Sequence, residues 1–200
     1  NNYSLAFDGS DDYVEASFGV EFGTGEWSVS FWVKPLSGSG ITEYIFSMYN
    51  DTSGTNRWGY RKDGQIYAPW IGGDGFIISN ADGAIDLVDD VWTHVAIVHN
   101  GNITVYQNGD EAYSNADTSN YTVTENYVRF GHSASGTTAA HYFQGIINEV
   151  SIWGSALTLG EIQAIFNDGV ALDVSSDSGD YASSDDLVGY WRNTGTGTWT

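Results

Sequence analysis

The sequence predicts an all-β fold, a two-sheet antiparallel sandwich of the jelly-roll kind with one short helix near residues 158–168. Three observations lead to this prediction. Apolar and polar residues alternate with period two along most of the chain, turn sequences rich in Gly, Asn and Asp separate the alternating runs, and one segment alone has helical periodicity. Many short strands joined by turns, with one helix, are typical of a sandwich.

The strand signal is clearest between Trp27 and Val33, where large apolar residues hold the odd-numbered positions and serine holds two of the three even-numbered ones. Because successive side chains of a strand point to opposite faces, this pattern predicts a half-buried strand. The same signal predicts further strands at about residues 4–7, 43–48, 57–60, 65–70, 76–79, 92–98, 103–107, 127–131 and 142–153.

Turn and helix signals complete the pattern. Asp63-Gly64 and Asn108-Gly109 are dipeptides that favour tight hairpin turns. The helix is predicted to begin after Thr158, which is followed three residues later by Glu161 as in a capping box, and to stop at Gly169.

Length and composition predict one soluble globular domain. The 200 residues are 41% hydrophobic, which suffices for a real core, and they include no cysteine and no apolar run of membrane-spanning length. Six basic residues against 26 acidic ones give a net charge of −20. This charge excludes nucleic acid as a partner bound through phosphates, and we expect no membrane insertion.

The chain divides into three parts that differ in composition and in hydrophobic pattern. Residues 1–170 carry the alternating pattern and are predicted to form the sandwich domain. Residues 171–186 are rich in Asp and Ser and predict a mobile acidic loop. Residues 187–200 begin with an apolar run, and two alternatives remain open for them: a closing strand of the sandwich or the start of a following module.

Four ordered blocks resemble the laminin G-like, concanavalin A-like jelly-roll domains of bacteria and viruses. The blocks are Leu5-Ala6-Phe7-Asp8-Gly9 with Asp12-Tyr13-Val14, Trp27 to Pro35, Val91 to Ala96 leading to Val105 to Gly109, and Phe143 to Trp153 followed by Ala156 to Ile162. The resemblance spans about residues 1–170. It implies two antiparallel sheets, one of them concave, and structural roles for the tryptophans inside the blocks, which are Trp27, Trp92 and Trp153.

The resemblance also implies a Ca²⁺ site. The family's usual carboxylate in the last long strand is replaced here by Asn148, whose amide oxygen adds no charge. Asp8, Asp11 and Asp12 are the acids that could supply the missing charge. The alternative is that Asp8-Gly9 forms only a tight turn and that Asn148 is an ordinary strand residue.

Catalytic relatives of this fold exist, namely laminarinase-type glucanases and alginate-lyase-like enzymes, so an enzymatic function is one alternative for this chain. A retaining glucanase needs two carboxylates about 5 Å apart, which a strand supplies as alternating acids, and no predicted strand has this pattern. A Gly-x-Ser-x-Gly nucleophile elbow is also absent. We therefore expect a protein that is not an enzyme, with a polysaccharide hydrolase or lyase as a remaining alternative.

The chain contains more aromatic residues than its core requires, and this excess indicates a function. Eight Trp and 13 Tyr exceed the usual needs of one sandwich core, and flat aromatic faces stack on sugar rings in non-catalytic glycan modules. The candidates for ligand contact lie in neighbouring predicted strands and their loops: Tyr44, Tyr49, Trp58, Tyr60 and Trp70. The alternative is that most of these rings fill the core.

These observations predict a binding module that recognises a glycan or another surface polymer, displayed outside a microbe or on a virion surface. A second hypothesis is a structural or decorating domain that packs against other chains of an extracellular assembly, such as a phage capsid or fibre. Both hypotheses fit the absence of catalytic pairs, and fold-level resemblance alone does not separate them.

Overall fold

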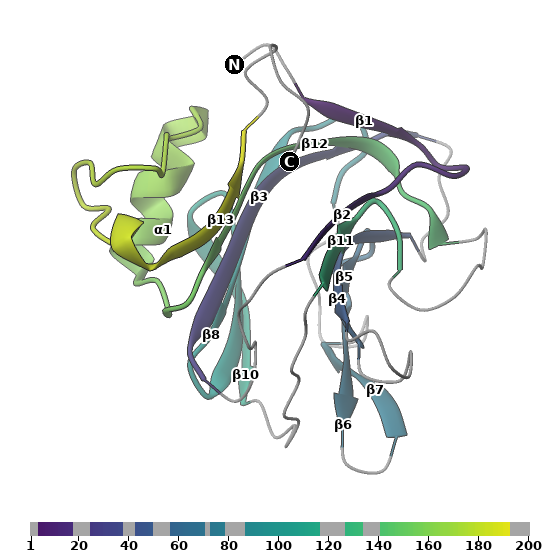
Figure 1. The fold of residues 1–200 in the computed structure, drawn as a ribbon, viewed down its shortest axis with the longest axis horizontal. Helices are drawn as coiled ribbons and strands as arrows, with labels where there is room; N and C mark the ends of the chain where they lie inside the picture. The colour runs from purple at the N-terminus through teal and green to yellow at the C-terminus, as the bar shows by residue number, and fades with distance from the viewer. Residues whose placement is uncertain are drawn as a thin grey trace.

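The computed structural model describes residues 4–17, 25–37, 43–49, 57–70, 73–78, 87–116, 127–133 and 141–192. Within these residues the chain forms two antiparallel sheets that face each other, with α1 (Leu159–Phe166) on the outer side of one of them (Figure 1). The seven-stranded sheet runs β1 (Leu5–Asp8), β12 (Gln144–Trp153), β3 (Trp27–Pro35), β8 (Thr93–His99), β9 (Asn102–Gln107) and β10 (Asp110–Ala116), with β13 (Leu187–Trp191) also paired to β12. The six-stranded sheet runs β2 (Val14–Ser17), β11 (Tyr127–Phe130), β4 (Tyr44–Tyr49), β5 (Arg57–Arg61), β6 (Ile66–Trp70) and β7 (Gly73–Ile78).

This architecture confirms the predicted sandwich with one short helix. The two described strands that sequence patterning missed are β2 and β10. The strand β2 has only four residues, and β10 (sequence DEAYSNA) is an edge strand with a largely polar sequence. Edge strands bury little apolar surface, so their alternation signal is weak.

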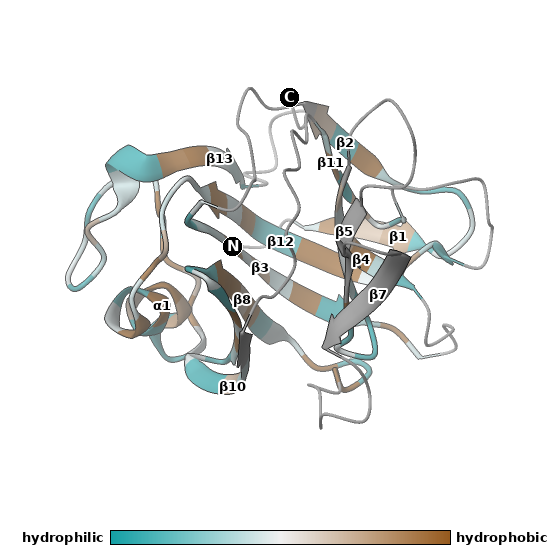
Figure 2. Ribbon diagram, turned by 90° about the horizontal axis from the view of Figure 1, so that it is seen from below, coloured by the Kyte–Doolittle hydropathy of each residue, from teal (hydrophilic) through white to brown (hydrophobic). Residues whose placement is uncertain are grey.

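The main core lies between the two sheets. On β3, Trp27, Val29, Phe31 and Val33 all point into it, as the alternation predicts, and Figure 2 shows hydrophobic and polar positions alternating along β3 and β12. The prediction of a half-buried strand is wrong, however, because the other face of β3 is buried too. Trp32 on that face stacks on Phe166 of α1, with ring centroids 5.9 Å apart, so the helix covers a face that a simple sandwich leaves in water.

The helix begins as predicted. The Thr158 hydroxyl accepts from the Glu161 N–H at 3.3 Å, and the Glu161 carboxylate accepts from the Thr158 N–H at 2.9 Å. The helix ends two residues before the predicted stop, because Asn167 already takes the left-handed conformation at φ 47°. Such a residue cannot continue a right-handed helix, and Asn tolerates the conformation better than most side chains.

Residues 171–186, predicted as a mobile loop, are packed against the helix side of the seven-stranded sheet. Tyr181 is fully buried there, and its hydroxyl donates to the Val174 carbonyl and accepts from Trp153 Nε1–H, both at 2.9 Å. The following strand β13 pairs antiparallel with β12, placing Trp191 opposite Val150. The acidic composition of residues 171–186 favoured a mobile loop, but the buried ring of Tyr181 holds this segment on the sandwich.

A bulge in β12 separates its two neighbours on one edge. The strand β1 pairs with Gln144–Ile147 and β13 pairs with Val150–Trp153, while Glu149 between them has φ 49°. Bulges locally redirect a strand and its side chains.

Among the described residues, no helix is long and apolar enough to span a membrane.

Candidate functional site

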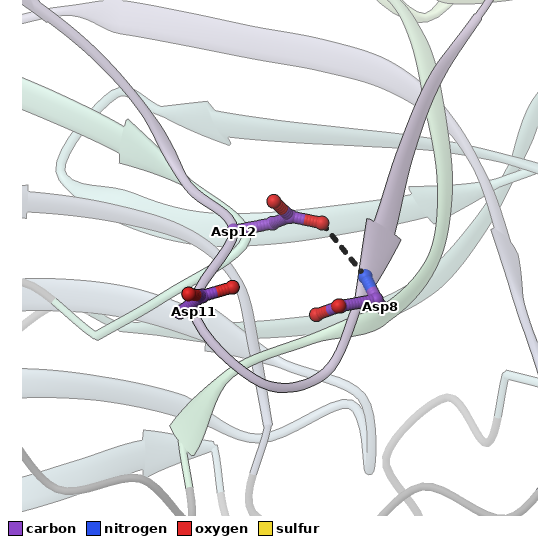
Figure 3. A group of neighbouring side chains, drawn as sticks. All are labelled: Asp8, Asp11 and Asp12. Atoms are coloured by element: carbon purple, nitrogen blue, oxygen red, sulfur yellow. Dashed lines mark hydrogen bonds between the residues drawn. The ribbon is translucent and has the colours of Figure 1, made fainter.

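Three carboxylates gather in the loop between β1 and β2. Asp8, Asp11 and Asp12 are exposed, and each can offer an oxygen within 4.8 Å of the other two (Figure 3). The loop is held by its own side chains, since the Asp8 N–H donates to Asp12 Oδ2 at 3.1 Å and the Ser10 N–H donates to Asp8 Oδ1 at 2.8 Å. We call Asp8, Asp11 and Asp12 the acidic triad. Oxygen donors with three negative charges suit Ca²⁺, which takes six to eight oxygen ligands.

Asn148 does not belong to this cluster, which corrects the predicted ligand set. The register of β12 places Gln144, not Asn148, opposite Asp8. Four residues of strand separate Gln144 from Asn148, or about 13 Å at roughly 3.3 Å per residue. Asn148 instead lies opposite Trp32 and is buried. A metal bound by the acidic triad would therefore have no ligand from Asn148.

The loop of the acidic triad rests against the end of β11. Gly131 there has φ +86°, and a Cβ at this position would lie 2.4 Å from the Phe7 ring and 3.2 Å from the Asp12 carbonyl oxygen. Only glycine allows both the left-handed conformation and this close approach. Gly131 thus lets the loop that carries the acidic triad pack closely against the end of β11.

Side chains of β2 and β11, and of residues just outside these strands, form a polar and aromatic cluster on the outer face of the six-stranded sheet. Tyr13 is 49% exposed, and the guanidinium of Arg129 lies 4.5 Å from the centre of its ring. Arg129 also donates to Glu15 at 2.6 Å, an ion pair between the opposed strands β11 and β2. His132 stacks on Tyr142 at 3.9 Å between centroids and has Tyr13 as a further neighbour at 6.3 Å. Tyr13 is therefore held in place while much of it stays open to solvent.

Sequence reasoning did not select this cluster. The chain segment Asp12-Tyr13-Val14 carries part of the family resemblance, but nothing local indicates that Tyr13 is exposed or that Arg129 lies beneath it. The two residues are joined only by the pairing of β2 with β11. A pattern search restricted to neighbouring residues cannot detect such a contact.

The predicted aromatic set divides into two groups. Tyr60 has no exposed surface and lies in the core between the sheets, where burial raises the pKa of its hydroxyl. Tyr44 is also buried, against Gly59 and the His141 ring. For these two the structure corrects the prediction, because a covered ring offers no face to a sugar. The side chains of Tyr49, Trp58 and Trp70 lie outside the described ones, so for them ligand contact stays a prediction.

The carboxylates of Glu161 on α1 and Glu149 on β12 form hydrogen bonds and an ion pair within the fold. Burial alone would raise the pKa of Glu161, but hydrogen bonds from Ser183, Thr158 and Ala182 outweigh it and hold that pKa below its usual range. Glu149 accepts from the Tyr190 hydroxyl and forms an ion pair with Arg192 at 3.2 Å. Both carboxylates therefore stabilise the packing of residues 171–192 on the sandwich.

The chain belongs to the concanavalin A-like lectin/glucanase superfamily, whose family model of the laminin G type matches residues 8–163. This range contains both sheets except β1 and β13, and it includes most of α1. No curated protein matches the chain.

Several solved structures share the fold at low sequence identity. Domain 4 of AbnA, a GH43 extracellular arabinanase from Geobacillus stearothermophilus solved with arabinotriose, has a TM-score of 0.65 at 20% identity, over 81% of this chain and 75% of that one. The SAP-like pentraxin of Limulus polyphemus has a TM-score of 0.58 at 17% identity, over 82% and 81%. The binding domain of botulinum neurotoxin serotype D has a TM-score of 0.61 at 16% identity, over 83% and 42%.

Proposed function

We propose that this protein is a non-catalytic binding module that recognises a glycan on an extracellular surface, with Tyr13 and the acidic triad as its contact site. The observation that carries the proposal is the exposure of Tyr13, which follows three clustered carboxylates directly in the chain. An exposed, held aromatic ring with polar groups around it is the usual design of a sugar site. The arabinotriose bound to the similar arabinanase domain is consistent with this role.

The residues of the site divide the task of binding. The Tyr13 ring offers an apolar face to the C–H side of a sugar, and its position is maintained by Arg129. Glu15 and Arg129 supply acceptors and donors for sugar hydroxyls at the edge of that face. The acidic triad would hold Ca²⁺, which supplies a cation that sugar hydroxyls can coordinate.

A glycan array run with and without Ca²⁺ tests the proposal. We expect the wild-type chain to bind at least one saccharide, Tyr13→Ala to weaken that binding about tenfold, and Tyr13→Phe to retain most of it, because the ring face is kept. Trp58→Ala and Trp70→Ala, measured in parallel, decide whether these two rings also contact the ligand. Silence of the wild-type chain on all glycans would contradict the proposal and favour a domain that packs within an extracellular assembly.

Calcium binding at the acidic triad is tested separately from sugar binding. We expect saturating Ca²⁺ to raise the melting temperature of the wild-type chain, corresponding to about 2.7 kcal/mol at 100 times the dissociation constant. Asp11→Asn removes one charge of the acidic triad and should abolish most of this shift, whereas Asp180→Asn, at an exposed acid after α1, should leave it unchanged. An equal shift in all three proteins would place the bound Ca²⁺ elsewhere.

A further inference from the structure

Among the Lys and Arg side chains that the structure describes, one lacks a carboxylate partner. Among the six Lys and Arg residues, the side chains of five are described, and four of those five form ion pairs. The pairs are Arg61 with Asp63, Lys62 with Asp89, Arg129 with Glu15, and Arg192 with Glu149 and Asp173. Within the described residues, Lys34 instead lies beside an aromatic ring, with its Nζ 6.0 Å from the centre of Trp92.

Trp92 is exposed where the family resemblance implied a structural residue. Trp27 and Trp153, in the other blocks of the resemblance, are 2% and 0% exposed, but Trp92 is 39% exposed. Val88 and Val91 in the same loop are exposed as well. Exposed apolar surface of this kind, centred on a large ring, is typical of a contact site.

Lys34 and Trp92 lie where the cover of the seven-stranded sheet ends. Val33 pairs with Thr93, so continuing the same register places Lys34 opposite Trp92 on the outer face. Trp32 lies two residues before Lys34 on β3, on the same face, and it is covered by Phe166, the last residue of α1. The same row continues across β12 and β1 through the half-buried Ile146, opposite Lys34, and the exposed Ala6. We call Ala6, Ile146, Lys34 and Trp92 the shelf.

The shelf is continuous with the acidic triad. Asp8 follows Ala6 by two residues on β1, so it lies on the same face of the sheet, one row beyond the shelf. Three strand spacings of about 4.8 Å place the β1 end of the shelf roughly 14 Å from the β8 end that carries Trp92. A polysaccharide that crosses the strands can therefore contact Trp92 and the acidic triad together.

We propose that the shelf binds a sugar unit that carries a carboxylate, a uronic acid residue of a polysaccharide, with its ring on Trp92 and its carboxylate accepting hydrogen bonds from Lys34 Nζ. The proposal rests on the glycan-binding function proposed above and extends it to the class of ligand. Each other described cation has its carboxylate within the chain, and for Lys34 the ligand supplies it. Charge-assisted hydrogen bonds of this kind are about twice as strong as neutral ones.

The test compares polygalacturonate with its methyl ester, which has the same backbone without the charges. Near 0.15 M salt, where charges are screened beyond about 8 Å, the net charge of −20 does not mask a local contact. We expect the wild-type chain to bind the acid about tenfold more tightly than the ester, and Lys34→Gln to remove that preference. Arg192→Gln is the matched control, since it deletes a cation already paired with Glu149 and Asp173, neither of which lies in the loop of Trp92.

Trp92→Phe gives a second readout that does not depend on affinity alone. We expect polygalacturonate to change the tryptophan fluorescence of the wild-type chain and to leave that of folded Trp92→Phe nearly unchanged. Three outcomes would contradict uronic acid binding at the shelf while leaving the glycan-binding function intact. They are binding of neutral glycans alone, equal binding of acid and ester, and unchanged binding of the acid by Lys34→Gln. Binding of neither polymer nor any neutral glycan overturns both proposals.

Discussion

Replacing Tyr181 with alanine is expected to lower the free energy of unfolding by about 3–5 kcal/mol, the usual cost of deleting a buried large ring. Tyr181 has no exposed surface, and its ring meets the Trp153 ring edge-on at 6.2 Å. The hydroxyl also satisfies the buried Trp153 Nε1–H. Tyr181→Phe keeps the ring but leaves that donor without its acceptor, so we expect a smaller cost of about 1–3 kcal/mol.

Urea unfolding of the two variants and of Val170→Ala measures these costs. Val170 is 66% exposed and precedes the same segment, so its truncation should change the free energy of unfolding by less than about 0.5 kcal/mol. A cost below about 1 kcal/mol for Tyr181→Ala, within the error of the Val170 control, would mean that residues 171–186 do not pack on the sandwich in solution.

The second large effect concerns His94 and acid. His94 is fully buried between Trp32 and Phe166, with centroids at 5.4 and 5.9 Å, and burial lowers the pKa of its imidazole to about 3. In the unfolded chain this pKa is near 6.5. Between pH 6.5 and 3 the unfolded chain therefore binds a proton at His94 that the folded chain does not bind. The stability from neutral His94 is therefore complete above pH 6.5 and is lost as the pH falls toward 3, by up to about 1.4 kcal/mol per pH unit.

Comparing the wild-type chain with His94→Gln between pH 7 and 4.5 isolates this effect. Glutamine is neutral throughout and can still bond Ser30, which lies 2.8 Å from His94 Nε2. We expect His94→Gln to be less stable at pH 7, because packing is lost, but to lose less of its stability on acidification. Parallel pH profiles for the two proteins would show that His94 is not buried as a neutral group.

Most strands and the helix of this protein were predictable from local sequence because their signals are local, whereas β2 and β10 gave no such signal. The serine and apolar alternation of residues 27–33, the Thr158 and Glu161 capping box and the Asn108-Gly109 turn each act within a few residues, and the structure contains all three. The acidic triad was found for the same reason, since Asp8, Asp11 and Asp12 share one short loop.

The candidate site was predictable only where its members are neighbours in sequence. Asn148 was joined to the acidic triad by family resemblance, and the register of β12 against β1 separates them. Tyr60 and Tyr44 were candidates for ligand contact, and both are buried. Tyr13, which is exposed, and Arg129, which lies against its ring, meet through strand pairing between residues more than a hundred positions apart.

The sequence by itself therefore determined most of the strands, though not β2 or β10, and it also determined where the helix begins and which residues of a strand share a face. Tertiary structure decided which faces meet water. Alternation indicates that two sets of side chains point to opposite sides, but what covers each side comes from distant segments. Thus α1 covers Trp32 and Trp153 packs on Tyr181, while Trp92 stays 39% exposed. Burial depends on these long-range contacts, and so exposed Tyr13 and unpaired Lys34 appear only once the sheets are assembled.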